Sequence, residues 1–221
     1  MNADYALKVV LQHSDLPWAQ GPEARIERRF LEKGGEGGSR ATAILRGHPG
    51  AHWVSLAGEE IFVLDGAISD ENREYPAGTY LMFPPGMRAP LFTVAGCTLF
   101  TKCGHLISDV MQRECIDTHH APWYQGLVPG LNVMPLMRQG TGSTLVRWAP
   151  KTYFDAHRHF GGEEIFVVSG IFSDEHGHYP EGTWIRSPHM SQHTPFSVEG
   201  CTIFVKTGHL LAGQEHSPFG V

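Results

Sequence analysis

The sequence predicts an all-β protein made of two tandem β-barrels or double-sheet jelly rolls. Short runs rich in Ile, Val, Phe, Tyr and Thr, such as EEIFVVSG, GTWIRS and CTIFVKTG, alternate with clusters of Gly, Pro, Asp and Asn. This pattern is typical of antiparallel strands joined by tight turns. Almost no segment carries apolar residues at helical spacing; ADYALKVVLQ near the start is one candidate, and a strand fits it equally well.

The chain is an internal duplication, which accounts for the tandem arrangement. Glu59 and Glu163 are 104 positions apart, and this offset holds without a gap from GEEIFV through SDE, YP, GT, GCT and GHL. PWAQG at 17–21 also matches PWYQG at 122–126. A repeat of this length indicates two compact domains. We therefore predict domains at 1–110 and 118–221, with the polar segment 107–121 as the linker.

Composition excludes several classes of partner. The 221 residues carry a formal net charge of −6, and the basic residues are scattered except in RIERRF at 25–30. This argues against nucleic acid and anionic membrane surfaces as partners.

The start lacks signal-peptide features, and no apolar run approaches the roughly 20 residues of a membrane helix. Four cysteines without CxxC spacing suggest reduced thiols. We expect a soluble, cytoplasmic protein.

The stretch AHRHFGGEEIFVVSG at 156–170 places ligand-type side chains close together. His157 and His159 lie on one face of a strand, because alternate residues of a strand point to the same side. A three-residue hairpin loop at 160–162 would set Glu163 opposite His159. A fourth ligand could come from His189 or His193. Imidazole nitrogens with one carboxylate suit iron, manganese, nickel, copper or zinc better than calcium or magnesium.

The second repeat resembles the cupin superfamily. Its two motifs, H-x-H-x3-E-x6-G and G-x5-P-x4-H, are matched by His157, His159, Glu163, Gly170, Gly182, Pro188 and His193. One departure is Met190, where the second motif usually has glycine. The resemblance implies a double-stranded β-helix, or jelly-roll, fold and a metal held by His157, His159, Glu163 and His193.

A narrower resemblance covers nearly the whole chain. GGEEIFVVSGIFSDEHGHYPEGTWIRSP and EGCTIFVKTGHL resemble the ChrR-like cupins, named for the cupin half of a zinc-binding bacterial anti-sigma factor. The resemblance implies a tandem bicupin with one divalent transition-metal ion, often zinc in the anti-sigma members. Some single-domain cupins of similar appearance are metal-dependent dioxygenases that cleave small diketones.

The first repeat has lost most of these ligands. At the 104 offset, Trp53, Ser55 and Ala89 stand where the second repeat has its histidines, and only Glu59 is kept. We therefore expect a degenerate, metal-free domain. An alternative is a rearranged site in which His48 and His52 reach Glu59.

Comparing the repeats also sorts the other polar residues. Features present in both should serve the fold, since one repeat lacks the site: Asp70 and Asp174, Tyr75 and Tyr179, Lys102 and Lys206, His105 and His209. Residues found only in the second repeat are weak catalytic candidates: Arg186, His189 and Gln192. Aromatic candidates for a pocket wall are Trp148, Tyr153, Phe154 and Trp184.

Three functions remain open at this point. A metal-dependent oxygenase-type enzyme would bind a small carbonyl compound at open positions of the metal. A ligand- or metal-sensing regulatory module would follow the anti-sigma resemblance; direct sigma-factor binding is not expected, because the helical zinc domain that binds sigma factors in that family has no counterpart. A structural zinc site would be closed by four ligands. A small-molecule ligand is expected, and a homodimer is left open.

Overall fold

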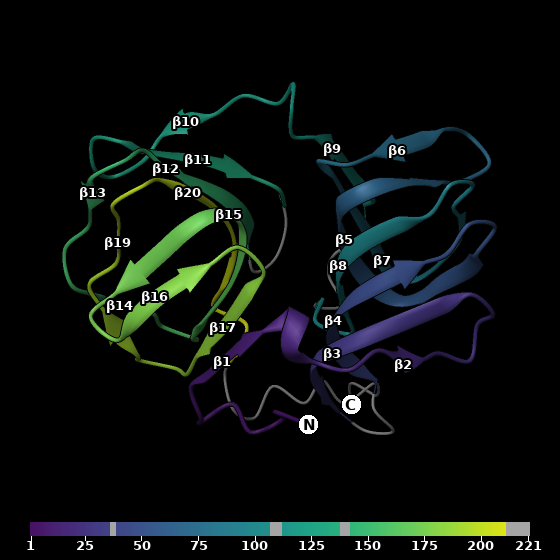
Figure 1. Ribbon diagram of the computed structural model, residues 1–221, viewed down its shortest axis with the longest axis horizontal. Helices are drawn as coiled ribbons and strands as arrows, with labels where there is room; N and C mark the ends of the chain where they lie inside the picture. The colour runs from purple at the N-terminus through teal and green to yellow at the C-terminus, as the bar shows by residue number, and fades with distance from the viewer. Residues whose placement is uncertain (36–38, 107–111, 138–141, 211–221) are drawn as a thin grey trace, which may run out of the picture.

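The computed structural model describes residues 1–35, 39–106, 112–137 and 142–210. These residues form two β-barrels that lie side by side (Figure 1). The described part of the chain contains no α-helix, and one short 3-10 helix spans His13–Asp15. The predicted all-β fold with two tandem jelly rolls is therefore confirmed.

The first barrel is built around an eight-stranded sheet in the order β2-β3-β4-β8-β5-β7-β9, with β6 paired to β5. Its strands are β2 (Ala19–Gln20), β3 (Ile26–Gly34), β4 (Arg40–Gly47), β5 (His52–Ser69), β6 (Glu74–Pro76), β7 (Thr79–Phe92), β8 (Cys97–Cys103) and β9 (Glu114–Asp117).

The second barrel is built around the path β1-β17-β15-β20-β12-β11-β10, with β13, β16 and β19 attached and β14 paired to β18 separately. Its strands are β1 (Val9–Gln12), β10 (Tyr124–Gln125), β11 (Leu131–Pro135), β12 (Ser143–Trp148), β13 (Thr152–Tyr153), β14 (His157–Arg158), β15 (Glu163–Asp174), β16 (Gly177–Pro180), β17 (Thr183–Ser187), β18 (Gln192–His193), β19 (Phe196–Ser197) and β20 (Cys201–Thr207).

The two barrels exchange a strand. β1, from the start of the chain, pairs with β17 of the second barrel, with Val10 opposite Ile185. β9, from the start of the second repeat, pairs with β7 of the first barrel, with Cys115 opposite Leu81. The last part of the ambiguous segment at the start, Val9–Gln12, is thus a strand. Part of the expected linker is a strand as well, while its residues 107–111 lie outside the described part of the chain. Each barrel therefore contains one strand from the other sequence repeat: β1 belongs to the second barrel and β9 to the first.

Three apolar clusters support this arrangement. One fills the first barrel around Leu81 and another fills the second around Ile203. The third lies between the barrels and combines residues of both, including a 5.2 Å edge contact between Phe100 and Phe204. Phe100 and Phe204 are equivalent residues of the two repeats, so the contact surface is close to symmetric.

Buried ion pairs also join the barrels. Lys102 Nζ lies 2.6 Å from Glu164 Oε2, and Lys206 Nζ lies 2.8 Å from Glu60 Oε2. All four side chains are buried. The carboxylates also accept hydrogen bonds from equivalent residues, from Trp184 Nε1 to Glu164 and from Tyr80 Oη to Glu60. Both lysines therefore stabilise the contact between the barrels, the structural role that their presence in both repeats predicts.

All four cysteines are free, and Cys97 and Cys201 are buried. Among the described residues, no helix has the length and apolar character needed to span a bilayer.

Candidate metal centre

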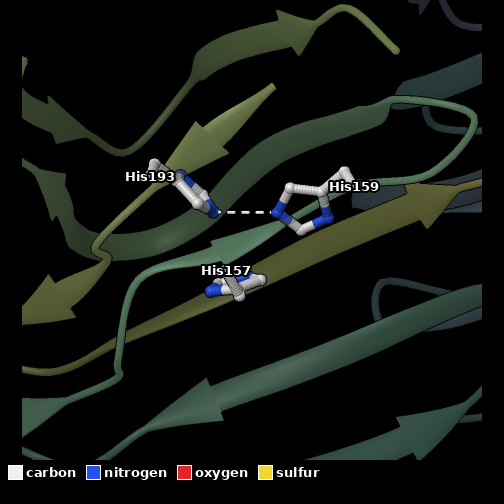
Figure 2. A group of neighbouring side chains, drawn as sticks. All are labelled: His157, His159 and His193. Carbon is white, nitrogen blue, oxygen red and sulfur yellow. Dashed lines mark hydrogen bonds between the residues drawn. The ribbon is translucent and has the colours of Figure 1, made fainter. Parts of the chain in front are cut away.

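Three histidines converge at one end of the second barrel. β14 and β18 form a short antiparallel pair in which His157 lies opposite His193. His159 follows directly after β14, and its Nε2 lies 3.0 Å from Nε2 of His193. Figure 2 shows the three imidazoles grouped together, and one ring nitrogen from each lies within 4.8 Å of the others. Three of the four predicted ligands are thus close enough to share an ion.

The local backbone differs from the predicted hairpin. β14 pairs with β18 and not with β15, so His159 and Glu163 are not opposite members of a ladder. Residues 159–162 form a turn in which Gly162 N–H donates to the carbonyl of His159 at 3.1 Å. Gly161 and Gly162 both have φ of +74°, a conformation that favours glycine. The tight turn still brings Glu163, the first residue of β15, back to the histidines.

Glu163 completes the group of ligand-type side chains. Its Oε2 lies 3.4 Å from His159 Nε2 and 3.5 Å from His193 Nε2. The same oxygen is buried and has no hydrogen-bond partner in the described structure. Burial raises the pKa of this carboxyl to about 7. A buried carboxylate oxygen without a partner is costly, and a cation among these four side chains would satisfy it. The residues present therefore fit a transition-metal ion.

Contacts outside the cluster orient two of the imidazoles. The Nδ1–H of His157 donates to the carbonyl of Asp155 at 3.0 Å. The lone pair on Nε2 is therefore the one that can bind a metal. Nδ1 of His193 lies 3.7 Å from Asp174 Oδ2. Metal-binding histidines usually have such a partner on the second nitrogen. Burial, together with the neighbouring His193 and His157, lowers the pKa of His159 to about 4, so this imidazole is neutral and able to bind a metal at neutral pH.

Comparison of the two repeats assigns Asp174 to the fold, and in the structure it also contacts the candidate ligand His193. Like Asp70 in the first barrel, it accepts a hydrogen bond from a tyrosine, at 2.8 Å from Tyr179 Oη, compared with 2.6 Å from Tyr75 Oη to Asp70. Only Asp174 also faces a candidate ligand. The signal in the sequence was the presence of His193 where the first repeat has Ala89.

A cavity of about 330 Å³ opens beside the cluster. Three candidate ligands, His157, Glu163 and His193, form part of its wall. The remaining lining is largely apolar. Most of it comes from β10 to β12, β15 and β20: Gln125, Leu131, Val133, Val146, Trp148, Ile165, Phe172, Ile203 and Val205. Segments between strands add Gly126, Leu127, Phe154 and Pro195. The lining contributed by residues 125–133 was not predicted from the sequence, because this segment itself contains no His, Cys, Asp or Glu.

The weak catalytic candidates lie elsewhere. Arg186 is fully buried beside the first barrel, where its Nη1 lies 3.6 Å from Glu32 Oε2 and its Nη2 donates to the carbonyl of Asp4 at 2.7 Å. His189 is exposed, and its Nδ1 accepts from Gly161 N–H at 2.9 Å. Gln192 is exposed and accepts from Arg158 Nε at 3.1 Å. None of the three lines the cavity.

The aromatic candidates divide between two regions. Trp148 and Phe154 line the cavity. Tyr153 is 61% exposed and stacks on Phe196, while Trp184 is buried between the barrels and donates to Glu164.

The equivalent place in the first barrel has no comparable group. Its strand register sets Ser55 opposite Ala89, so Ser55, and not Trp53, matches His157 in space. Trp53 packs inside the apolar cluster of that barrel. His48 pairs with Glu27 at 2.8 Å and His52 is exposed, so the described contacts do not bring this pair to Glu59. Within the described residues, the three histidines of the second barrel are the group suited to a metal.

Known structures share this fold at low sequence identity. A candidate dioxygenase from Nostoc punctiforme aligns with a TM-score of 0.76 and 15% identity, covering 97% of this chain and 88% of that one. A bacterial pirin of Escherichia coli in complex with nickel(II) aligns with a TM-score of 0.65 and 12% identity, covering 93% and 100%. Oxalate decarboxylase of Bacillus subtilis aligns with a TM-score of 0.61 and 12% identity, covering 90% and 77%.

Sequence comparison gives a more specific assignment. No curated protein matches the chain significantly. The ChrR cupin-like domain matches it twice, at residues 7–107 and 111–211, which together span nearly the whole chain. The chain therefore belongs to the ChrR cupin-like family, as a tandem pair of cupin domains.

Proposed function

We propose that the second cupin binds one divalent transition-metal ion and works as a metal-dependent, oxygenase-type enzyme on a small carbonyl compound. His157, His159, Glu163 and His193 would hold the ion. The observation that carries the proposal is that three of these four side chains form the polar end of an otherwise apolar cavity. A ligand in that cavity would reach the ion directly.

The chain supplies the features that such chemistry needs. Three imidazoles and one carboxylate would hold a transition metal and would leave positions for substrate and oxygen or water. A bound ion of this kind acts as a Lewis acid that polarises a carbonyl or enolate oxygen. Leu131, Val146 and Ile203 would surround the rest of the ligand with apolar side chains, and excluding water there would strengthen electrostatic interactions at the polar end.

A purely structural zinc site is less favoured by this geometry. Structural zinc sites are closed by four protein ligands and have no access for small molecules. Here His157, Glu163 and His193 face a cavity large enough for a small ligand. The solved structures support the proposal in a general way, since one is a candidate dioxygenase and another holds nickel(II) in the same fold.

Ligand sensing is the second candidate, and one observation favours it. β15 carries Glu163 in the candidate site and Glu164 in the ion pair with Lys102 of the other barrel. A conformational change at the metal site could therefore be transmitted to the contact between the barrels, because Glu163 and Glu164 are adjacent residues of one strand.

Oxygen uptake tests the enzyme proposal. Metal-free protein is reconstituted separately with iron(II), manganese(II), nickel(II) and zinc(II), and each form is mixed with a panel of small diketones and hydroxyketones. We expect substrate-dependent uptake with a redox-active metal, its loss in His159→Ala, and its retention in His52→Ala, which changes an exposed histidine of the first barrel. A metal-loaded protein that binds members of the panel without consuming oxygen would favour sensing.

A further inference from the structure

The cavity beside the metal centre has one polar end and an apolar body. Its ionisable lining residues are His157, Glu163 and His193, all of them candidate ligands. The described lining contains no lysine or arginine, and Gln125 is its other polar side chain. Gln125 and Leu127 are both exposed, Leu127 by 87%, so they lie where the cavity meets solvent.

Aromatic rings extend the apolar surroundings up to the ligands themselves. Phe154 packs edge-on against His157 with ring centroids 4.8 Å apart, and Phe172 lies 6.2 Å from His193. The part of a bound ligand that extends away from the metal would therefore contact carbon atoms immediately.

The position opposite the shared glutamate also differs between the two barrels. In the first barrel Phe83 lies opposite Glu59, and its ring is buried in the apolar cluster. In the second barrel Ser187 lies opposite Glu163. A hydroxymethyl group thus replaces a phenyl ring next to the carboxylate.

These features restrict the charge that a ligand can carry. One anionic oxygen at the polar end would be balanced by the cation held there. A second charge on the body of the ligand would lie among Leu131, Val146 and Ile203 without a partner, which is unfavourable in an apolar site. Apolar groups in the same place would instead gain from leaving water.

We propose that the cavity takes a small ligand with a single oxygen-bearing head group and an uncharged, apolar body, and that it discriminates against dianions such as dicarboxylates. This inference rests on the metal site of the proposed function. The volume, at the low end of the range for small-molecule pockets, limits the ligand to a compact molecule.

Ligand binding to cobalt(II)-loaded protein tests the inference without any turnover, because the visible absorption of cobalt(II) changes when a ligand joins it. The probes are acetate, butyrate and hexanoate, with succinate as the dianion that matches butyrate in length. We expect about three- to fourfold tighter binding for each buried CH₂. We also expect succinate to bind at least about tenfold more weakly than butyrate.

Two variants test whether the carboxylate probes bind inside the cavity. Val146→Phe fills part of the lining and should weaken hexanoate binding more than acetate binding, with cobalt retained. Val198→Phe adds the same bulk at an exposed position outside the lining and should leave both affinities unchanged. Cobalt-loaded protein with equal affinity for succinate and butyrate, or no dependence on chain length, would overturn this inference alone. Failure to bind cobalt would overturn the metal site and, with it, this inference.

Discussion

Asp174 Oδ2 lies 3.7 Å from Nδ1 of His193, and this contact sets the second barrel apart from the first. Asp70 occupies the equivalent turn, accepts the equivalent tyrosine hydroxyl and pairs with Arg113 at 2.9 Å, but Ala89 stands where the histidine would be. Lys8 approaches Asp174 at 3.5 Å in the place that Arg113 takes beside Asp70. A turn present in both barrels thus gains a contact with the candidate site in only one.

This difference predicts unequal effects of two equivalent substitutions. Asp174→Asn should weaken metal binding by about 10- to 100-fold, because the carboxylate that faces His193 Nδ1 is lost. Asp70→Asn should remove similar turn contacts without changing metal affinity. Competition with a colorimetric chelator measures the affinity, and urea unfolding of the metal-free proteins measures the shared structural cost. Equal metal affinities in the two variants would assign Asp174 to the fold alone.

Metal affinity should depend on pH through Glu163. Burial raises the pKa of its carboxyl to about 7 in the metal-free protein, whereas the ion binds the carboxylate. Below about pH 7 a proton must therefore leave before binding, and the affinity should fall by about tenfold for each pH unit.

Glu163→Gln provides the control for this pH effect. It should bind metal more weakly and should show a much smaller pH dependence between about pH 7 and pH 5, since the amide has no proton to lose in this range. Zinc titrations at a series of pH values check both proteins. A slope that is the same in the wild type and in Glu163→Gln would show that another group controls the effect.

The buried ion pair between Lys102 and Glu164 should be strongly coupled. Lys102→Met leaves the Glu164 carboxylate in the interior without its cation, which should cost about 3 kcal/mol in the free energy of unfolding. Burial by itself raises the pKa of Glu164, but Lys102 and His209 hold that pKa well below its usual value, so the carboxylate is charged in the wild type.

A double-mutant cycle measures that coupling. Glu164→Gln in the Lys102→Met background should recover part of the loss, because position 164 then no longer carries an unpaired buried charge. Urea unfolding of the four proteins gives the coupling energy. Strictly additive effects would mean that the two side chains do not stabilise each other.

The exchanged strands predict how the chain can be divided. Co-expressed fragments 1–110 and 118–221 lack β9 and should associate poorly, because the edge of β7 is left without its partner. Fragments 1–112 and 113–221 retain both exchanged strands and should form a stable complex. Size-exclusion chromatography and circular dichroism distinguish the two outcomes. Independent folding of 118–221 as a monomer would show that β1 is dispensable for the second barrel.

Local patterns in the sequence were sufficient for the fold class and for part of the candidate site. The all-β fold followed from short apolar runs between turn residues, and the duplication followed from the constant spacing between repeats. The candidate ligands His157 and His159 could be placed together because strand alternation is a local property. His193 required the family resemblance, since it lies on a different strand and His189 was an equal candidate by composition.

Properties that depend on distant contacts were not predictable in this way. The strand character of Val9–Gln12 was one of two readings, but nothing in those residues indicates that they pair with β17 of the other repeat. The sequence makes Arg186 a candidate for the site because the first repeat has Met82 there, yet its partners are Glu32 and the chain start, which come together only through the strand exchange. The predicted hairpin at 160–162 was wrong in its pairing because β18, more than 30 positions away, provides the ladder.

Metal analysis of the purified protein tests the central claim most directly. Wild type, His159→Ala and His52→Ala are expressed without nickel-affinity chromatography or chelators and measured by inductively coupled plasma mass spectrometry. We expect about one transition-metal ion per chain in wild type and His52→Ala and almost none in His159→Ala. Wild-type protein that stays free of metal even after dialysis against iron, manganese, nickel and zinc, or His159→Ala with the wild-type content, would contradict a metal centre at His157, His159, Glu163 and His193.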